Sequence, residues 1–272
     1  MVKNIAALLV ILAFSVVFME AARFSILRIL VYIACLLVGY YFFTKRSLSL
    51  SGFASGMMLG LAILATTPLI MWFVPIMAFF VIGSVASKYG WRYKRRRGIS
   101  ENPKGRGVWN VLGNGGVALA CAVIFFLTQQ EIFLYAYIGS IASACADTVA
   151  TEMGQLSRKR PVLMASFRKV PAGTTGAISL FGEIMAFMGS AVIAAIPLFY
   201  FGYLGFWNFG GFAVITVAGF LGCQVDSLIG SSLEMRDLKK KRGIRLFNNH
   251  STNFLSTLAA AVICGILYSV FL

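Results

Sequence analysis

The stretch "ADTVATEMG", residues 146–154, places two carboxylates, Asp147 and Glu152, at the end of a long apolar run. A second stretch, "VDSLIGSSLE" at residues 225–234, repeats this arrangement about eighty residues later. Both runs are long enough to cross a bilayer as helices, which takes about 20 mainly apolar residues. Ionisable groups in membrane helices are energetically costly and commonly mark a functional site. The two stretches therefore predict membrane helices that carry a polar site.

The composition of the whole chain indicates a membrane protein. Of the 272 residues, 59% are hydrophobic and 12% are charged, and the mean hydropathy is +0.85, whereas about a quarter of the residues are charged in typical soluble domains. We expect an all-α, polytopic integral membrane protein with a single transmembrane domain over residues 1–272. The apolar runs predict about nine transmembrane helices, at residues 4–22, 26–43, 50–66, 68–87, 109–129, 132–153, 175–200, 209–233 and 251–271.

The basic residues predict the orientation of these helices. Of 24 Lys and Arg residues, eight lie in residues 88–106, five in 158–169 and six in 236–245. All three segments fall on the same side of a nine-helix arrangement, and the positive-inside rule makes that side cytoplasmic. We therefore expect a cytoplasmic N-terminus. The net charge of +15 is explained by this orientation and by contact with anionic membrane lipids.

Several other classes of function are excluded by composition. Trp91 and Tyr93 are too few aromatic residues among the basic ones for a nucleic-acid surface, so no nucleic-acid partner is expected. The five cysteines are scattered through the predicted spans and indicate neither a disulfide framework nor a zinc site. His250 is the single histidine, which argues against a multi-histidine metal site and against a Ser-His-Asp triad.

Polar residues divide the chain into two parts. Residues 1–87 have almost none within their predicted spans, as expected for plain scaffold helices, whereas residues 88–272 hold nearly all of them. At about 100° per residue, the polar residues of each of the last five spans share one helix face, and most lie in its cytoplasmic half. We therefore expect them to line one cavity open to the cytosol. These faces consist of Arg106, Asn110 and Asn114; Asp147, Thr148, Thr151, Glu152 and Gln155; Thr175, Ser179, Glu183 and Ser190; Asp226, Ser227, Gly230 and Glu234; and Asn249, Asn253 and Ser256.

The segment "FRKVPAGTTGAISLFGE", residues 167–183, has the composition of an anion site. Arg168 and Lys169 precede a Gly-Thr cluster, residues 173–176, at the start of a predicted helix. Free backbone N–H groups and the positive end of the helix dipole favour a phosphate there. The segment is not a Walker A loop, which has the pattern GxxxxGK[ST]. It predicts phosphate contact, with helix capping or close helix packing as the alternative role of the small residues.

Phosphoryl transfer uses the groups found in this chain, which are carboxylates, amides, basic residues and a glycine loop. It does not need a histidine base. This reaction depends on positioning and charge neutralisation, with Mg²⁺ held by acids and phosphates held by Arg, Lys and backbone amides. An acceptor that is already a phosphate monoester needs no general base. An apolar acceptor also explains a site in a membrane, because its tail stays in lipid while its head group meets a cytosolic nucleotide.

Five motifs carry a resemblance to a known family: "GRGVWNVLGNGG", "ADTVATEMG", "VPAGTTGAISLFGE", "GCQVDSLIGSSLE" and "NNHSTNFLS". In this order they resemble a membrane family that includes plant phytyl-phosphate kinase and human transmembrane protein 19, over about residues 10–272. The resemblance implies phosphorylation of an isoprenoid monophosphate to the diphosphate, from CTP or a related nucleoside triphosphate. Two residues depart from the family pattern: Asn110 stands where Gln is expected, and Glu234 stands where relatives often carry Gln. The matching positions are Asn114, Asp147, Thr148, Glu152, Gly173, Thr174, Gly176, Ser179, Asp226, Ser227, Asn249 and Asn253.

The leading hypothesis is a Mg²⁺-dependent membrane lipid kinase that phosphorylates phytyl or another polyprenyl monophosphate from a nucleoside triphosphate. Asp147, Glu152 and Asp226 are the predicted Mg²⁺ ligands and, with Asn114 and Asn253, the predicted catalytic residues. Contacts to substrate and phosphate are assigned to Arg106, Asn110, Thr148, Arg168, Lys169, Gly173, Thr174, Thr175, Gly176, Ser179, Ser227 and Asn249.

Two alternatives use the same residues. A cytidylyltransferase that makes a CDP-lipid needs the same groups but releases pyrophosphate. A transporter is the third hypothesis, because the pairs Asp147-Thr148 and Asp226-Ser227 hint at a duplicated unit with intramembrane acids. The long basic loops at 88–106 and 158–169 argue against a transporter, since a carrier does not need them.

Overall fold

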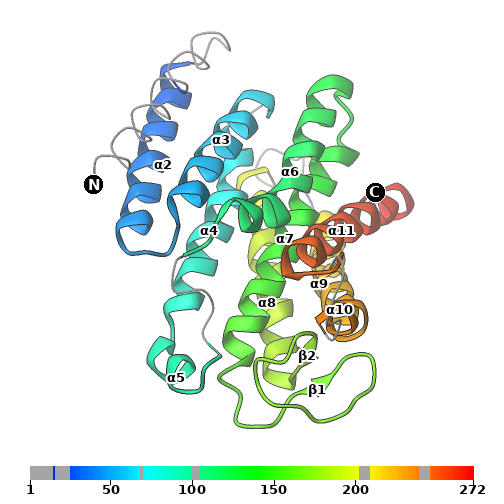
Figure 1. Ribbon diagram of the computed structural model, residues 1–272. Helices are drawn as coiled ribbons and strands as arrows, with labels where there is room; N and C mark the ends of the chain where they lie inside the picture. Colours follow the sequence, from blue (N-terminus) through cyan, green and yellow to red (C-terminus); the bar gives the residue numbers. More distant parts are fainter. Residues whose placement is uncertain (1–14, 16–24, 68–69, 100–104, 202–208, 239–245) are drawn as a thin grey trace.

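The computed structural model describes residue 15 and residues 25–67, 70–99, 105–201, 209–238 and 246–272. These residues form a bundle of helices with one short hairpin (Figure 1). The predicted span 4–22 lies outside them, apart from Ser15. The helices are α2 (Ile26–Thr44), α3 (Leu50–Thr66), η1 (Ile70–Trp72), α4 (Phe73–Lys88), α5 (Trp91–Arg96), α6 (Val108–Thr128), α7 (Ile132–Gly154), α8 (Leu180–Phe201), α9 (Phe209–Ile229), the π-helix η2 (Gly230–Glu234), α10 (Met235–Leu238) and α11 (Asn249–Phe271).

The hairpin connects α7 to α8. Its strands, β1 (Val162–Leu163) and β2 (Ala177–Ile178), are antiparallel, with Val162 opposite Ile178 and Leu163 opposite Ala177. The segment thus folds back on itself at one end of the bundle before α8 begins.

Seven helices of the described part are long and apolar enough to cross a membrane. They are α2, η1 with α4, α6, α7, α8, α9 continued through η2 into α10, and α11. The α3 helix is also apolar but has 17 residues, which places it below this length. The prediction of a helical, multi-pass membrane protein is therefore confirmed, whereas the count of nine spans stays a prediction.

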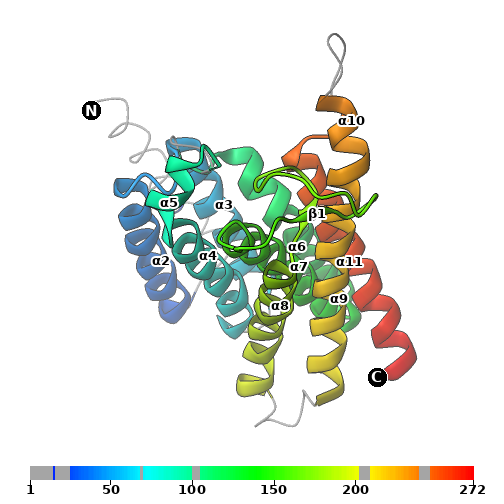
Figure 2. The same cartoon turned by 90° about the horizontal axis from the view of Figure 1, so that it is seen from below.

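Figure 2 shows that α5, β1 and α10 lie at the same end of the bundle, and the C-terminus lies at the opposite end. The described parts of the three basic segments are therefore on one side, as their spacing along the chain predicts. Which membrane face this end occupies stays a prediction from the positive-inside rule.

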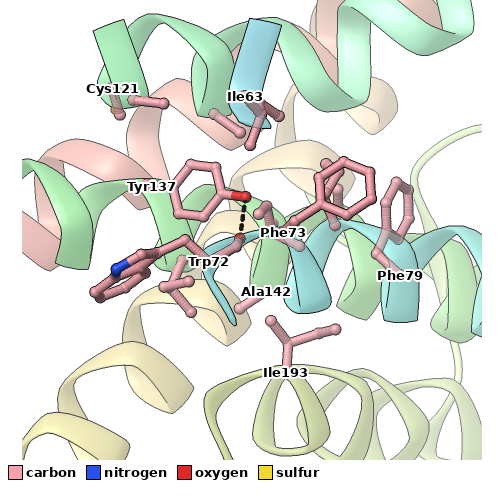
Figure 3. Close-up of a cluster of buried hydrophobic side chains, with 14 of the residues drawn as sticks. Ile63, Trp72, Phe73, Phe79, Cys121, Tyr137, Ala142 and Ile193 are labelled. Atoms are coloured by element: carbon pink, nitrogen blue, oxygen red, sulfur yellow. Dashed lines mark hydrogen bonds between the residues drawn. The ribbon is translucent and has the colours of Figure 1, made fainter. Parts of the chain in front are cut away.

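The α7 helix is the central element of the bundle. It packs against α4, α6, α8, α9 and α11, and 78% of its apolar stretch is buried, against 17–44% for the other spans of the described part. Near its N-terminal end, the fully buried Tyr137 donates a hydrogen bond of 2.6 Å to the backbone oxygen of Trp72 (Figure 3). Without that acceptor, a buried hydroxyl costs about 1–3 kcal/mol, so this bond fixes η1 against α7.

Small residues allow the other helices to approach α7 closely. A Cβ atom at Gly219 of α9 would lie 2.6 Å from the Cβ of Ala142 and 2.4 Å from the Oγ of Ser190. A Cβ at Gly222 would lie 2.4 Å from the Oγ of Ser143 and 2.7 Å from the Cβ of Ala260. Membrane helices associate through packing of small residues, because lipid offers no hydrophobic drive. The two glycines therefore set the distance between α7 and α9.

We expect Gly219→Ala to lower the midpoint of thermal unfolding in detergent, because the added methyl overlaps the backbone and Cβ of Ala142. Overpacking of this kind costs about 1–3 kcal/mol. Gly116→Ala is the matched control, since its Cβ would meet only the ring of Phe254, at 3.6 Å. Equal unfolding midpoints for the two variants would contradict this close packing of α9 on α7.

Candidate active site

One cavity of about 280 Å³ opens among α6, α7, α9, α11 and the segment before α8. Each helix contributes residues from the end of the bundle where the basic segments lie. The cavity also includes Thr151, Gln155, Glu183 and Glu234. The predicted site residues in its wall are Arg106, Asn110, Asn114, Asp147, Thr148, Glu152, Gly173, Thr174, Thr175, Gly176, Ser179, Asp226, Ser227, Asn249 and Asn253.

Two amide side chains meet across the contact between α6 and α11. The Nδ2 of Asn253 donates to the Oδ1 of Asn114 at 3.3 Å, and the Nδ2 of Asn114 donates to the backbone oxygen of Asn110 at 2.9 Å. A Cβ at Gly113 would lie 2.8 Å from the backbone oxygen of His250, so a glycine is needed for this close approach. In this pair of hydrogen bonds Asn253 acts only as a donor, and its Oδ1 is buried with no hydrogen-bond partner in the described residues.

Other buried oxygens in the cavity wall also lack a partner among the described residues. They are the Oδ2 of Asp226 and the Oε1 of Gln155. Buried polar atoms in folded proteins are almost always paired, so a water molecule, an ion or a ligand is expected to pair with these oxygens. Two further acids are already engaged: Glu183 accepts from the Nε2 of Gln224 at 2.7 Å, and Glu234 accepts from Thr252.

The cavity wall contains carboxylate oxygens, the kind of group that binds magnesium. Mg²⁺ is usually held by one or two carboxylates together with substrate phosphates and water. Asp147 and Asp226 both line the cavity. In the described residues no group of three or more acids, histidines or cysteines is gathered closely enough to hold a metal by itself. The predicted trio of Asp147, Glu152 and Asp226 is therefore not assembled as one set of ligands.

Glu152 instead forms an ion pair. Its carboxylate accepts from the Nζ of Lys94 at 2.5 Å, and Lys94 also donates to the backbone oxygen of Ala86 at 3.2 Å. Both side chains are almost fully buried, at 1% exposure for Lys94 and 5% for Glu152. The pair holds α5 against the ends of α4 and α7. Sequence reasoning counted Lys94 only as one of several loop cations and did not find this partner.

The Gly-Thr cluster lies in a loop and not at a helix start. Helix α8 begins at Leu180, after β2, so the predicted helix over 175–179 is wrong. Gly173 and Gly176 have φ of +84° and +68°, in the left-handed region that glycine tolerates and a helix excludes. A Cβ at Gly176 would lie 2.0 Å from the backbone nitrogen of Ser231 in η2. The cluster thus lines the cavity through loop backbone packed on the π-helix.

Arg168 and Lys169 lie outside the cavity. They are exposed in the hairpin, where the backbone oxygen of Arg168 accepts from the nitrogen of Leu163 at 2.9 Å. The prediction placed them next to phosphate because it assumed a helix directly after them. The segment turns at residues 164–166, and neither Arg168 nor Lys169 lines the cavity.

A second, basic cavity of about 930 Å³ adjoins the first. It shares Arg106, Asn110, Glu152 and Asn249 with the polar cavity. Its remaining basic residues were missed as site residues, because the sequence pattern explained them as topology signals. These are Lys45, Arg46, Lys88, Lys94 and Arg95, with Trp91 and His250 beside them.

A third, apolar pocket of about 100 Å³ lies between α2, α3, α4 and α6. It shares Arg106, Asn110 and Asn114 with the polar cavity. Arg106 borders all three spaces, and its guanidinium donates to the Oγ of Ser87 at 2.9 Å and to the backbone oxygen of Gly83 at 3.3 Å. The helices that were expected to be plain scaffold therefore border the site.

Comparisons with known proteins place this site in a family of membrane proteins. An uncharacterized membrane protein of Methanocaldococcus jannaschii is 32% identical over 193 residues, which is 71% of this chain and 74% of that protein. A membrane protein of Synechocystis is 30% identical over 197 residues, 70% of this chain and 73% of that protein. The chloroplastic protein VTE6 of Arabidopsis thaliana is 28% identical over 197 residues, 70% of this chain and 56% of VTE6.

No solved structure matches the chain. The model of the family described as integral membrane protein DUF92 matches residues 33–261. This range runs from α2 into α11 and contains every residue of the polar cavity. The match confirms the family resemblance of the sequence motifs, and the chain belongs to the integral membrane protein family DUF92.

Proposed function

We propose that the protein is a membrane lipid kinase that transfers a phosphoryl group from a nucleoside triphosphate, CTP by family resemblance, to a polyprenyl or phytyl monophosphate. One observation carries the proposal: a polar cavity with unpaired acceptor oxygens adjoins a basic cavity and an apolar pocket. A reaction between a polyanionic nucleotide and a lipid phosphate requires these three environments to meet at one place.

Asp147 and Asp226 are the proposed Mg²⁺ ligands of the protein. Both line the polar cavity from facing helices, and the Oδ2 of Asp226 has no partner among the described residues. When bound, Mg²⁺ neutralises the charge of the triphosphate oxygens. Glu152 is assigned a different task, because Lys94 compensates its charge. It positions α5, and with it the basic residues of the neighbouring cavity.

The basic cavity is the proposed entry for the nucleotide. Three or four negative charges of a triphosphate need cations, and Lys45, Lys88 and Arg95 border this space. Arg106 lies where it joins the polar cavity, so this guanidinium is placed between the donor and the acceptor. Guanidinium groups bind phosphate oxygens with two parallel hydrogen bonds.

The acceptor phosphate attacks as a nucleophile that is already ionised. One of its oxygens forms a bond to the γ-phosphorus, the bond from this phosphorus to the β–γ bridging oxygen breaks, and the nucleoside diphosphate leaves with that electron pair. No proton has to be removed from the nucleophile, which agrees with the absence of a histidine from the polar cavity wall. Asn114, Asn253 and the backbone of residues 173–176 orient the phosphate oxygens, because positioning supplies most of the catalysis in this reaction.

The identity of the acceptor lipid rests on the family. The chain resembles a family that includes plant phytyl-phosphate kinase, and the match to the chloroplastic protein VTE6 supports this likeness. A cytidylyltransferase would use the same polar cavity, so the products of the reaction distinguish the two enzymes.

Purified protein should transfer ³²P from the γ-position of a nucleoside triphosphate to farnesyl or phytyl monophosphate in the presence of Mg²⁺. The expected products are the lipid diphosphate and a nucleoside diphosphate, separated by thin-layer chromatography. Label from the α-phosphate in the lipid, with release of pyrophosphate, would identify a cytidylyltransferase instead. Movement of a solute across reconstituted vesicles without consumption of nucleotide would identify a transporter.

Asp226→Asn should lower turnover by about 100-fold or more, the effect of removing a group that stabilises transition-state charge, and Asp147→Asn should behave alike. Glu152→Gln is the contrasting variant. It should leave the Mg²⁺ concentration for half-maximal rate unchanged but lower stability by about 3–5 kcal/mol, because Lys94 then stays buried without its counter-charge. A higher Mg²⁺ requirement for Glu152→Gln would return this residue to the metal site.

Arg106→Gln should raise the KM for the nucleotide about tenfold, the loss of one charge-assisted contact. Arg168→Gln is the matched control, because Arg168 is exposed and does not line the cavity. Initial rates at varied nucleotide concentration measure both. An equal rise in KM for Arg168→Gln would show that the hairpin contacts substrate after all.

A further inference from the structure

The apolar pocket between α2, α3, α4 and α6 has a wall suited to a hydrocarbon chain. Tyr32 and Cys35 border it from α2, Met57 and Leu59 from α3, and Phe79 from α4. These five residues are 1–9% exposed, so this part of the pocket wall is buried. Its volume of about 100 Å³ suits a single narrow chain better than a two-chain lipid.

The pocket ends at the polar cavity. Arg106, Asn110 and Asn114 border both spaces, at the first turns of α6 and just before it. A molecule that extends through this junction has an apolar part among aromatic and aliphatic side chains and a polar part beside a guanidinium and two amides. This is the charge pattern of a lipid with one chain and a phosphate head.

Glycines of α3 leave room along one side of the pocket. Gly52, Gly56 and Gly60 border it at successive intervals of four residues, so they share one helix face. Gly52 is required by packing, because a Cβ there would lie 1.9 Å from the backbone oxygen of Arg106, and a Cβ at Gly60 would lie 3.2 Å from the ring of Phe73. A Cβ at Gly56 would meet nothing within 4 Å. The glycine at position 56 therefore leaves room in the pocket and is not needed for contact between helices.

We propose that this pocket holds the first isoprenoid units of the acceptor lipid, with its phosphate at the junction formed by Arg106, Asn110 and Asn114. The inference rests on the proposed kinase function and adds the place and orientation of its acceptor. Burial of each methylene contributes favourably to binding, so the pocket favours a lipid with an apolar chain over a short, soluble phosphate. Helices α2, α3 and α4, outside the polar cavity, thereby set which acceptor the enzyme takes.

The test is photoaffinity labelling with a prenyl monophosphate that carries a diazirine on its second isoprene unit. Purified full-length protein in nanodiscs is irradiated with this probe, digested, and mapped by mass spectrometry. We expect labelled residues on α3 and α4 around the pocket, among them Met57 and Phe79. Competition by unlabelled phytyl monophosphate should remove this labelling, and free inorganic phosphate should not.

Gly56→Leu fills the pocket and should reduce labelling of α3 and α4 about tenfold, the loss expected when two methylene groups no longer enter. Gly56→Ala should reduce the labelling less. This smaller substitution keeps the test valid if the Gly56→Leu variant does not fold. Gly116→Leu is the control: this glycine lies on α6 outside the pocket, where a Cβ would meet only the ring of Phe254, and labelling should match the wild type.

Two outcomes would overturn the pocket assignment. Labels confined to the lipid-facing sides of α8 or α11, or no competed labelling at all, would show that the chain of the lipid lies elsewhere. Full labelling of the Gly56→Leu variant would do the same. Labelling does not depend on turnover, so the labelling experiment and the kinase assay are read separately. If the wild type phosphorylates phytyl monophosphate but the pocket is not labelled, the pocket assignment alone is rejected. If the pocket is labelled but no phosphate is transferred, the kinase function alone is rejected.

Discussion

The close packing of α7 against its neighbours is the constraint on which the structure depends. In the described residues α4, α6, α8, α9 and α11 pack against it, and small residues such as Ala142 and Ser143 allow α9 to approach through Gly219 and Gly222. In a membrane this contact cannot rely on the exclusion of water, so van der Waals contact at short range has to supply it. The polar end of α7 is held in place by the packing of its apolar middle.

This packing explains how the protein keeps carboxylates among apolar helices. A buried charge is tolerated when it is paired or when it faces a polar cavity. Glu152 follows the first route, through Lys94, and Asp226 follows the second, with one oxygen left without a partner among the described residues. The two acids belong to the same end of the bundle but serve different purposes: one fixes structure and the other stays available to a ligand.

Arg106 connects the three spaces of the site. It borders the polar cavity, the basic cavity and the apolar pocket, and its guanidinium is held by Ser87 and Gly83 of α4. This guanidinium is one of several links between α4 and the helices of the polar cavity, beside the packing of α4 on α7. Under the proposed function, a lipid phosphate and a nucleotide would meet beside this guanidinium.

The sequence by itself determined the class of the protein, the family, the cavity-lining faces of α6, α7, α9 and α11, and the clustering of basic segments at one end. The class, the faces and the basic end follow from hydropathy, from the 3.6-residue period and from the placement of charge, which are local properties, and the family follows from the five motifs. The tertiary structure alone decided that Lys94 pairs with Glu152, that Arg168 lies outside the cavity, and that residues 173–176 form a loop on η2. Each of these depends on contacts between residues far apart in the chain, or on a left-handed glycine, which no helical period encodes.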